Sequence, residues 1–104
     1  MENWVLMVEA NCTEESRDSE FNKWYDDIHV PDVLSSSGFK SAARYAIKDR
    51  AKDKGKYLAI YEIETDDIKK TMEAFGTHIE GKKAAGRWTD LLEIVSRRLC
   101  KVEG

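Results

Sequence analysis

The sequence predicts one small α+β domain, spanning residues 1–104, in which four strands and two helices follow each other in the order β-α-β-β-α-β. Three observations predict it. A chain of 104 residues has the length of a single domain. Its apolar residues switch along the chain between the two-residue period of strands and the longer period of helices. Three Trp, four Tyr and three Phe supply the large apolar side chains that one core needs.

The first strand and the first helix are predicted from two contrasting patterns. Residues 4–10 are mostly apolar at both odd and even positions, which is typical of a strand that is covered on both faces. Residues 16–34 instead carry large apolar side chains at steps of three and four, as on one face of a helix. Pro31 has no backbone N–H, so we expect the helical hydrogen bonds to be interrupted near Asp27.

A hairpin and a second helix are predicted next. Residues 39–48 alternate, with Phe39 and Tyr45 on one side and Arg44 on the other. The charged loop 49–56 joins this strand to a second one at residues 57–64. Thr65 is a suitable N-cap for the helix that follows. The apolar stripe of that helix consists of Ile68, Met72, Phe75 and Ile79.

The last segment, residues 91–100, fits two interpretations. Leu91, Leu92, Val95 and Leu99 have helical spacing, whereas Leu92 and Ile94 fit the alternation of a strand. We favour a strand because it completes a four-stranded antiparallel sheet, with both helices on one face, in the ferredoxin-like arrangement. The other sheet face would expose the apolar side chains of the first strand. We therefore expect a homodimer in which two sheets face each other and form a dimeric α+β barrel.

Composition and charge exclude several kinds of partner. The net charge is -3 at pH 7, so we expect no nucleic acid partner, because nucleic acid binding depends on a basic surface. The basic residues of segment 48–56 are interleaved with acidic ones, as in a solvated turn. No apolar run reaches about 20 residues, so we expect no membrane span. Cys12 and Cys100 lack the spacing of a zinc site, and the chain begins without a signal-peptide pattern, so we expect a cytoplasmic protein without a metal.

His29 is the first candidate for a functional residue. It lies four residues after Tyr25 and eight after Phe21, so it projects with the buried stripe of the first helix toward the sheet. A histidine there is either a satisfied core residue or a site residue. Pro31 favours the second interpretation, because helix irregularities often accompany cavities. With an ordinary pKa near 6.5, a partly buried His29 would be neutral at pH 7 and could act as a base.

Further candidates belong to the same predicted pocket. His78 lies in the last turn of the second helix, where it either lines the pocket or acts as a cation at the end of the helix dipole. Tyr45 needs a hydrogen-bond partner if it faces the pocket, although a core or dimer-interface role is the simpler interpretation. Small Ser41 and Ala43 beside it leave room for a ligand. The aromatic residues expected to form the walls, whose default place is the core, are Trp24, Tyr25, Tyr61, Phe75 and Trp88.

Two stretches of the sequence resemble the dimeric α+β-barrel superfamily, nearest its EthD-like branch. They are residues 21–34, in which Trp24-Tyr25 precedes His29-Val30-Pro31, and residues 38–45, which begin with Gly38-Phe39. The resemblance implies a homodimer with a pocket between the sheet and the helices of each subunit. It also implies that the histidine of the His-x-Pro pattern corresponds to His29. His78 resembles, more loosely, the second-helix histidine of plant-type polyketide cyclases.

Members of this superfamily include polyketide cyclases, dehydratases and isomerases that use His and Tyr as acid–base groups. Others are cofactor-free monooxygenases or haem-degrading enzymes, but the Asn-Trp-His set of the latter is missing at matching positions here. The resemblance therefore implies a small cofactor-free enzyme of the lyase, cyclase or isomerase type, acting on a hydrophobic, aromatic or polyketide-like metabolite. His29 would move a proton, Tyr45 and Tyr25 would hydrogen-bond a substrate oxygen, and His78 would assist. Two alternatives stay open: a cofactor-free monooxygenase that uses the same pocket, and a non-catalytic ligand-binding or stress-related homodimer.

Overall fold

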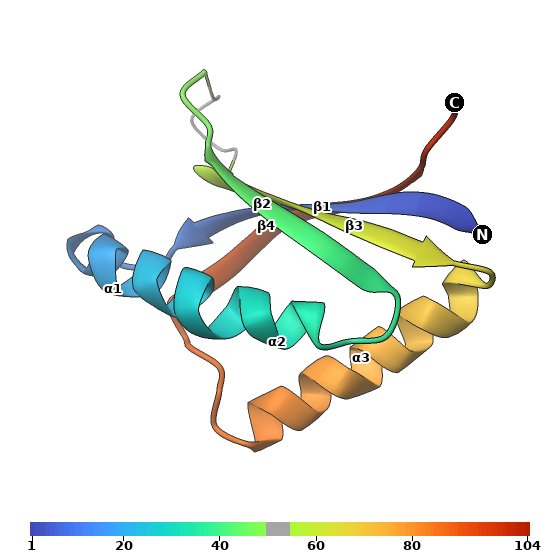
Figure 1. The fold of residues 1–104 in the computed structure, drawn as a ribbon. Coiled ribbons are helices and arrows are strands. Elements are labelled where there is room, and N and C mark those ends of the chain that lie inside the picture. The colour runs from blue at the N-terminus through green and yellow to red at the C-terminus, as the bar shows by residue number, and fades with distance from the viewer. Residues whose placement is uncertain (50–54) are drawn as a thin grey trace.

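The computed structural model describes residues 1–49 and 55–104, and it has the predicted order of strands and helices (Figure 1). The sheet forms one layer and the helices lie together on one side of it. The strands are β1 (Glu2–Cys12), β2 (Phe39–Ala46), β3 (Tyr57–Thr65) and β4 (Leu92–Lys101). The helical segments are η1 (Glu15–Arg17), α1 (Asp18–Trp24), η2 (Tyr25–His29), α2 (Val30–Leu34) and α3 (Ile68–Ala84). Part of the predicted loop 49–56 lies outside the described residues.

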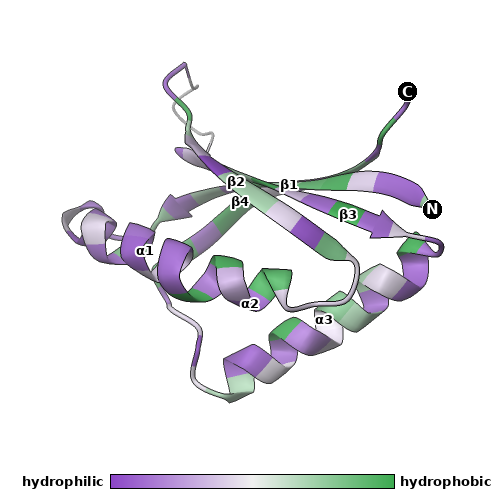
Figure 2. Ribbon diagram, viewed as in Figure 1, coloured by the Kyte–Doolittle hydropathy of each residue, from purple (hydrophilic) through white to green (hydrophobic). Residues whose placement is uncertain are grey.

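The strand order β2-β3-β1-β4, with every neighbouring pair antiparallel, confirms the ferredoxin-like fold. The central position of β1 explains why it is apolar on both faces. Its side chains Leu6 and Val8 are buried toward the helices, while Val5 and Met7 are half-buried on the outer face. Figure 2 shows this hydrophobic centre of β1, and it shows α3 alternating between hydrophobic and hydrophilic patches.

The first helix is continuous through residues 18–34, but its winding changes near the predicted interruption. The segment η2 is a π-helical turn, closed by a hydrogen bond from the Val30 N–H to the carbonyl of Tyr25 five residues earlier. Pro31 follows at the start of α2. Because Pro31 cannot donate to the carbonyl of Asp27, the wider turn accommodates the lost hydrogen bond. Single π turns within helices are frequent at functional sites.

The second helix, α3, begins two residues later than expected. Its N-cap is Asp67, whose Oδ1 accepts a hydrogen bond from the Lys70 N–H at 3.1 Å. The predicted cap, Thr65, is therefore wrong: its hydroxyl oxygen accepts from the Asp67 N–H at 3.1 Å and shapes the preceding turn. None of the residues of α3 is fully buried, so this helix does not close tightly on the sheet. No helix in the described part of the chain is both long and apolar enough to span a membrane.

The strand β2 differs from its predicted alternation. Its pairing with β3 shifts register between Phe39 and Ser41, and such an irregularity reverses the faces of the residues that follow. Phe39 is buried toward the helices, yet Arg44, opposite buried Ala59, lies on the same face. Tyr45 is on the outer face and is 52% exposed. The prediction that Tyr45 shares the face of Phe39 is therefore wrong, and Ser41 and Ala43 also lie on the outer face, opposite Glu62 and Ile60.

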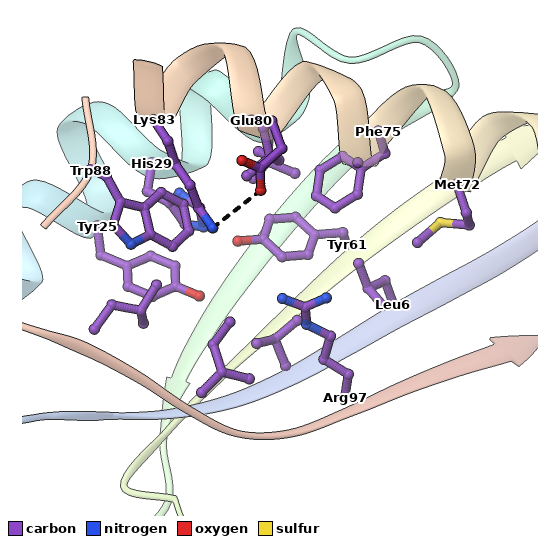
Figure 3. A pocket seen from close by; sticks show the side chains of 16 residues that line it. Leu6, Tyr25, His29, Tyr61, Met72, Phe75, Glu80, Lys83, Trp88 and Arg97 are labelled. Atoms are coloured by element: carbon purple, nitrogen blue, oxygen red, sulfur yellow. Dashed lines mark hydrogen bonds and ion pairs between the residues drawn. The ribbon is translucent and has the colours of Figure 1, made fainter. Parts of the chain in front are cut away.

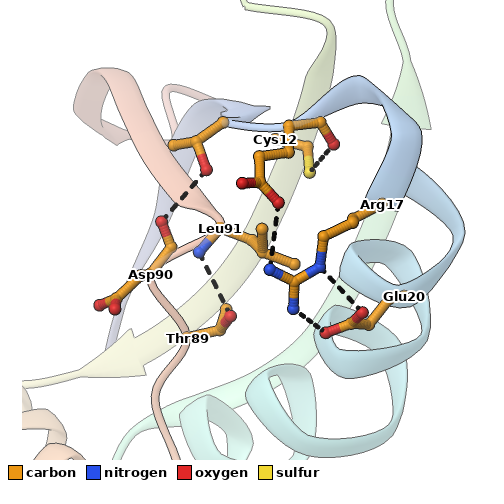
Figure 4. Close-up of polar contacts among 8 residues, drawn as sticks. Cys12, Arg17, Glu20, Thr89, Asp90 and Leu91 are labelled. Atoms are coloured by element: carbon orange, nitrogen blue, oxygen red, sulfur yellow. Dashed lines mark hydrogen bonds and ion pairs between the residues drawn. The ribbon is translucent and has the colours of Figure 1, made fainter.

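The segment 91–100 is mostly the strand β4, as favoured from the sequence, and its first residues are tied to the end of β1. The Thr13 N–H donates to the carbonyl of buried Leu91 at 2.8 Å, and the Thr13 hydroxyl donates to the carbonyl of Asp90 at 3.3 Å. The Leu91 N–H donates in turn to the hydroxyl of Thr89 at 3.2 Å (Figure 4). These bonds hold the chain after α3 against the sheet, which places Trp88 beside the first helix.

Candidate functional site

A cavity of about 200 Å³ lies between α3, the π turn and the inner face of the sheet. Its floor is formed by inward side chains of β1 and β3, and its far wall by the half-buried apolar side chains of α3 (Figure 3). The cavity exists because α3 does not pack tightly against the sheet, whereas the first helix buries side chains against the sheet. The aromatic and charged side chains that line it include Tyr25, His29, Tyr61, Glu80, Lys83, Trp88 and Arg97.

His29, the last residue of the π turn, is held by three aromatic rings. Its imidazole stacks on Trp24 with 4.9 Å between ring centroids and an angle of 16°. The rings of Tyr25 and Trp88 meet it edge-on, at 4.9 Å and 5.3 Å. Within the described residues, no hydrogen bond orients the imidazole. Its position is thus fixed by ring packing, while its nitrogens stay available to a ligand in the cavity.

The surroundings keep His29 uncharged. The pKa of His29 is lowered from 6.5 to about 4, with burial as the largest cause. The cations Arg44 and Arg97 contribute to this lowering of the pKa, while the carboxylate of Asp32 acts in the opposite direction. Burial has this effect because it disfavours the charged imidazolium. At pH 7 the imidazole is therefore neutral, with one nitrogen able to accept a proton or a hydrogen bond.

Two tyrosine hydroxyls provide the polar interior of the cavity. Tyr61 is 2% exposed, and its buried hydroxyl makes no hydrogen bond of good geometry, although the hydroxyl of Tyr25 is near enough to interact with it. Burial raises the pKa of both Tyr61 and Tyr25, and the two hydroxyls are close enough to influence each other's pKa. Both are consequently protonated at pH 7 and can donate. An unpartnered buried hydroxyl is costly, so the Tyr61 hydroxyl is suited to a polar atom that enters the cavity.

Arg44 fixes the position of Tyr25 from behind the cavity. Its guanidinium lies 4.0 Å from the centroid of the Tyr25 ring, a cation–π contact. Its two terminal nitrogens donate to Asp26 Oδ1 at 2.8 Å and to Asn22 Oδ1 at 2.9 Å. Arg44 therefore ties β2 to the first helix directly beneath the π turn.

The wall that carries Trp88 is held by a separate ion pair. The guanidinium of Arg87 binds the buried carboxylate of Asp32 at 2.8 Å and 3.0 Å, which lowers the pKa of Asp32. The indole N–H of Trp24 donates to the carbonyl of Arg87 at 3.2 Å. These bonds place Trp88 against His29 and attach the loop after α3 to the first helix.

His78 lies elsewhere. Its Nε2 is 2.8 Å from both the carbonyl oxygen of Asp32 and the hydroxyl of Ser35, so it joins α3 to the end of α2. It does not line the cavity that contains His29. The two histidines therefore occupy separate places. The prediction that His78 lies in the last turn of its helix is also wrong, because α3 continues to Ala84.

The cavity brings together only some of the residues selected from the sequence. His29, Tyr25, Tyr61, Phe75 and Trp88 line it, and Trp24 lies behind the His29 ring. Four other candidates, namely His78, Tyr45, Ser41 and Ala43, do not line the cavity. Tyr45, Ser41 and Ala43 face away from the cavity because the register shift in β2 puts them on the outer face of the sheet. The alternation of apolar and polar residues in the sequence does not reveal such a shift.

Sequence reasoning missed the charged side chains around the cavity. Arg97, on β4, lies opposite the inward-facing Val8 and lines the cavity. Lys83 and Glu80 of α3 line its exposed side and approach each other at 3.5 Å. The helical spacing of Phe75, Ile79 and Lys83 could have indicated Lys83. Arg97 could not be distinguished from Arg98, because β4 contains an irregularity opposite Glu9 and Ala10. Among the described residues, no group of three or more His, Cys, Asp or Glu side chains could hold a metal ion.

Comparison with known proteins gives a family and a set of structural relatives. A family model described as "Domain of unknown function (DUF4286)" matches residues 3–92. No curated protein matches the chain. A dimeric ferredoxin-like protein from an uncultured marine organism is similar in structure, with a TM-score of 0.66 and 13% identity over 98% of this chain and 96% of that one.

Two further solved structures with this fold are of enzymes or of ligand complexes. SnoaB, a cofactor-independent oxygenase from Streptomyces nogalater, has a TM-score of 0.61 and 12% identity over 100% of this chain and 96% of its own. A mutant of MhuD, with two manganese protoporphyrin IX molecules bound per active site, has a TM-score of 0.66 and 16% identity over 97% of this chain and 93% of its own. At these identities the comparison establishes a shared fold.

Proposed function

The chain belongs to the DUF4286 family, and on this premise we propose that it is a small enzyme whose cavity binds an aromatic or polyketide-like metabolite and in which His29 transfers a proton. One observation carries the proposal. His29 is neutral, makes no hydrogen bond within residues 1–49 and 55–104, and shares a largely apolar cavity with the buried hydroxyl of Tyr61, which has no hydrogen-bond partner of good geometry. A base beside a hydrogen-bond donor is the arrangement that removes a proton from a carbon or oxygen next to a carbonyl or phenol group.

In the proposed reaction the imidazole of His29 accepts the proton while negative charge develops on a substrate oxygen. The hydroxyls of Tyr25 and Tyr61 are donors suited to that oxygen, because burial keeps both protonated. Return of the proton from His29 to another position of the substrate completes an isomerase or cyclase reaction without a cofactor. In a lyase reaction the proton would instead pass to a leaving hydroxyl group, which departs as water. A well-placed general base contributes about 10² to 10⁴ in rate.

A cofactor-independent oxygenase is the second candidate, favoured by the shared fold with SnoaB. Removal of the same proton gives an electron-rich carbanion that can pass electrons to O₂. For a methylene group flanked by aromatic rings, the balanced reaction converts CH₂ and O₂ into C=O and H₂O, with all electrons supplied by the substrate and O₂. A third candidate is a ligand-binding protein without turnover, in which His29 only packs against the ligand.

We also propose that the outer face of the sheet forms a homodimer. Its half-buried apolar side chains include Val5, Met7, Leu58 and Ile60, and Tyr45 lies exposed beside them. Such a patch on a free surface favours association. The likeness to dimeric ferredoxin-like proteins supports this arrangement.

The test compares wild type, His29→Ala and His78→Ala on a panel of aromatic β-dicarbonyl compounds, phenols and anthrone-type substrates in D₂O. Because His78 lies outside the cavity, its variant is the matched control. We expect His29→Ala to lower turnover or deuterium incorporation by about 10² or more, and His78→Ala to stay within a few-fold of wild type. Equal activity in wild type and His29→Ala would exclude the proton-transfer role.

The same panel separates the three candidates. Oxygen consumption, with an atom from ¹⁸O₂ in the product, identifies the oxygenase. Isomerised, cyclised or cleaved product under nitrogen identifies the lyase, cyclase or isomerase. Tight binding of an aromatic compound without any product from the panel favours the ligand-binding protein.

A further inference from the structure

Arg97 is a cation in the cavity wall that has no partner among the residues that the structure describes. It lies on the inner face of β4 opposite buried Val8, on the side of the sheet that carries the buried apolar side chains. Within the described residues its guanidinium makes neither a hydrogen bond nor an ion pair. Arg98, on the outer face, likewise has no partner in residues 1–49 and 55–104, whereas Arg17, Arg44 and Arg87 each bind at least one carboxylate. An unpaired guanidinium that faces a cavity is available to an anion from outside the chain.

Cations exceed anions on the side of the cavity that Arg97 occupies. Arg97 and Arg44 are both close enough to affect the pKa of His29 and of Tyr25. The nearby carboxylates are paired with other cations, since Asp32 binds Arg87 and Glu80 approaches Lys83. In Figure 3 the Arg97 side chain rises from β4 and points into the space beneath the Tyr61 ring. The cavity thus presents one uncompensated positive charge to whatever enters it.

The size of the cavity limits what can accompany that charge. An apolar cavity of about 150 Å³ is known to hold a benzene molecule. The volume here, about 200 Å³, therefore encloses one aromatic ring with a small substituent, and further rings of a larger substrate would extend out of the open side. Arg97, Glu80 and Lys83 are exposed and lie on the open side, whereas Tyr25 and Tyr61 are buried. A ring inside the cavity would direct its substituent toward the guanidinium.

We propose that the cavity selects planar aromatic substrates that carry a carboxylate, with Arg97 binding the carboxylate at the open side and the ring entering the apolar interior. The planar fork of an arginine matches the two oxygens of a carboxylate in a bidentate arrangement. This inference rests on the proposed function, because it names the substrate class of the same cavity. It adds a substrate-binding role for Arg97 that neither the fold nor the sequence resemblance supplies.

Isothermal titration with benzoate and benzamide tests the inference, because the two probes have nearly the same shape and differ in charge. The proteins are wild type, Arg97→Gln and Arg98→Gln, the last a matched control because Arg98 is opposite Met7 on the outer face. We expect wild type and Arg98→Gln to bind benzoate at least tenfold more tightly than benzamide, and Arg97→Gln to lose that preference. Circular dichroism confirms that each variant is folded.

Each other outcome overturns a defined part of the account. Equal binding of benzoate and benzamide by wild type, or retained preference in Arg97→Gln, overturns the carboxylate inference and leaves the aromatic cavity of the proposed function standing. A loss in Arg98→Gln as large as that in Arg97→Gln shows a general charge effect and overturns the role of Arg97. Binding of neither probe at millimolar concentration overturns both the inference and the aromatic cavity.

Discussion

The buried, neutral state of His29 predicts a pH dependence of folding. In the unfolded chain His29 has its ordinary pKa of 6.5, whereas burial in the folded protein lowers that pKa to about 4. Between these two values the unfolded state binds more protons than the folded state, so acid favours unfolding. The contribution of His29 to the free energy of unfolding is therefore complete above pH 6.5 and decreases as the pH falls toward 4.

The magnitude follows from the two pKa values. A shift from 6.5 to about 4 corresponds to about 3 kcal/mol once the pH lies below both values. Between pH 7.5 and pH 5 the linkage relation gives a loss of about 2 kcal/mol. A comparison with a variant that lacks the imidazole removes the contributions that the other titratable groups make equally in both proteins.

The assay is urea unfolding of wild type and His29→Phe at pH 7.5, 6 and 5, at one fixed protein concentration because dimer formation contributes to apparent stability. Phenylalanine keeps a planar ring against Trp24 and Trp88 but cannot bind a proton. We expect wild type to lose about 2 kcal/mol more than His29→Phe over this interval. Equal losses in the two proteins, within about 0.5 kcal/mol, would show that His29 keeps an ordinary pKa and would refute the reasoning.

Three smaller predictions concern the dimer, the wall of the site and a helix cap. Tyr45→Glu, on the outer sheet face, should shift the protein to monomer in sedimentation at micromolar concentration, and a monomeric wild type would contradict the dimer. Arg87→Met leaves the buried carboxylate of Asp32 unpaired. The melting temperature of Arg87→Met should therefore be several degrees below that of Arg17→Met, because Arg17→Met loses only exposed ion pairs (Figure 4). Similar melting temperatures of the two variants would count against a structural role of the Arg87–Asp32 ion pair. Asp67→Ala removes an N-cap and should cost about 1 kcal/mol in urea unfolding, with no change expected if the cap is irrelevant.

The fold was predictable because hydrophobic spacing reflects which faces are covered. Apolar residues at both odd and even positions of β1 indicated a central strand that is covered on both faces. In the structure β1 is a central strand of the sheet. Pro31 indicated an irregular turn, because a missing N–H must leave a carbonyl unpaired, and the structure has a π turn ending at His29. These signals are local, so one sequence is enough to read them.

The details of the site were less predictable because they depend on sheet register. A single irregularity after Phe39 moved Tyr45 out of the cavity and turned Arg44 toward the helices. A second one in β4 decides that Arg97, and not Arg98, faces the cavity. The partners of His78 come from another helix. Alternation over a few residues cannot reveal such shifts, because adding one residue exchanges the two faces of a strand.

The central claim is that the cavity around His29 is the functional site, and a crystal structure of the protein soaked with benzoate tests it most directly. The account predicts the aromatic ring between α3 and the sheet, close to His29 and Trp88, with its carboxylate at hydrogen-bond distance from the Arg97 guanidinium. Benzoate bound on another surface, with this cavity empty in the same crystal, would contradict the claim.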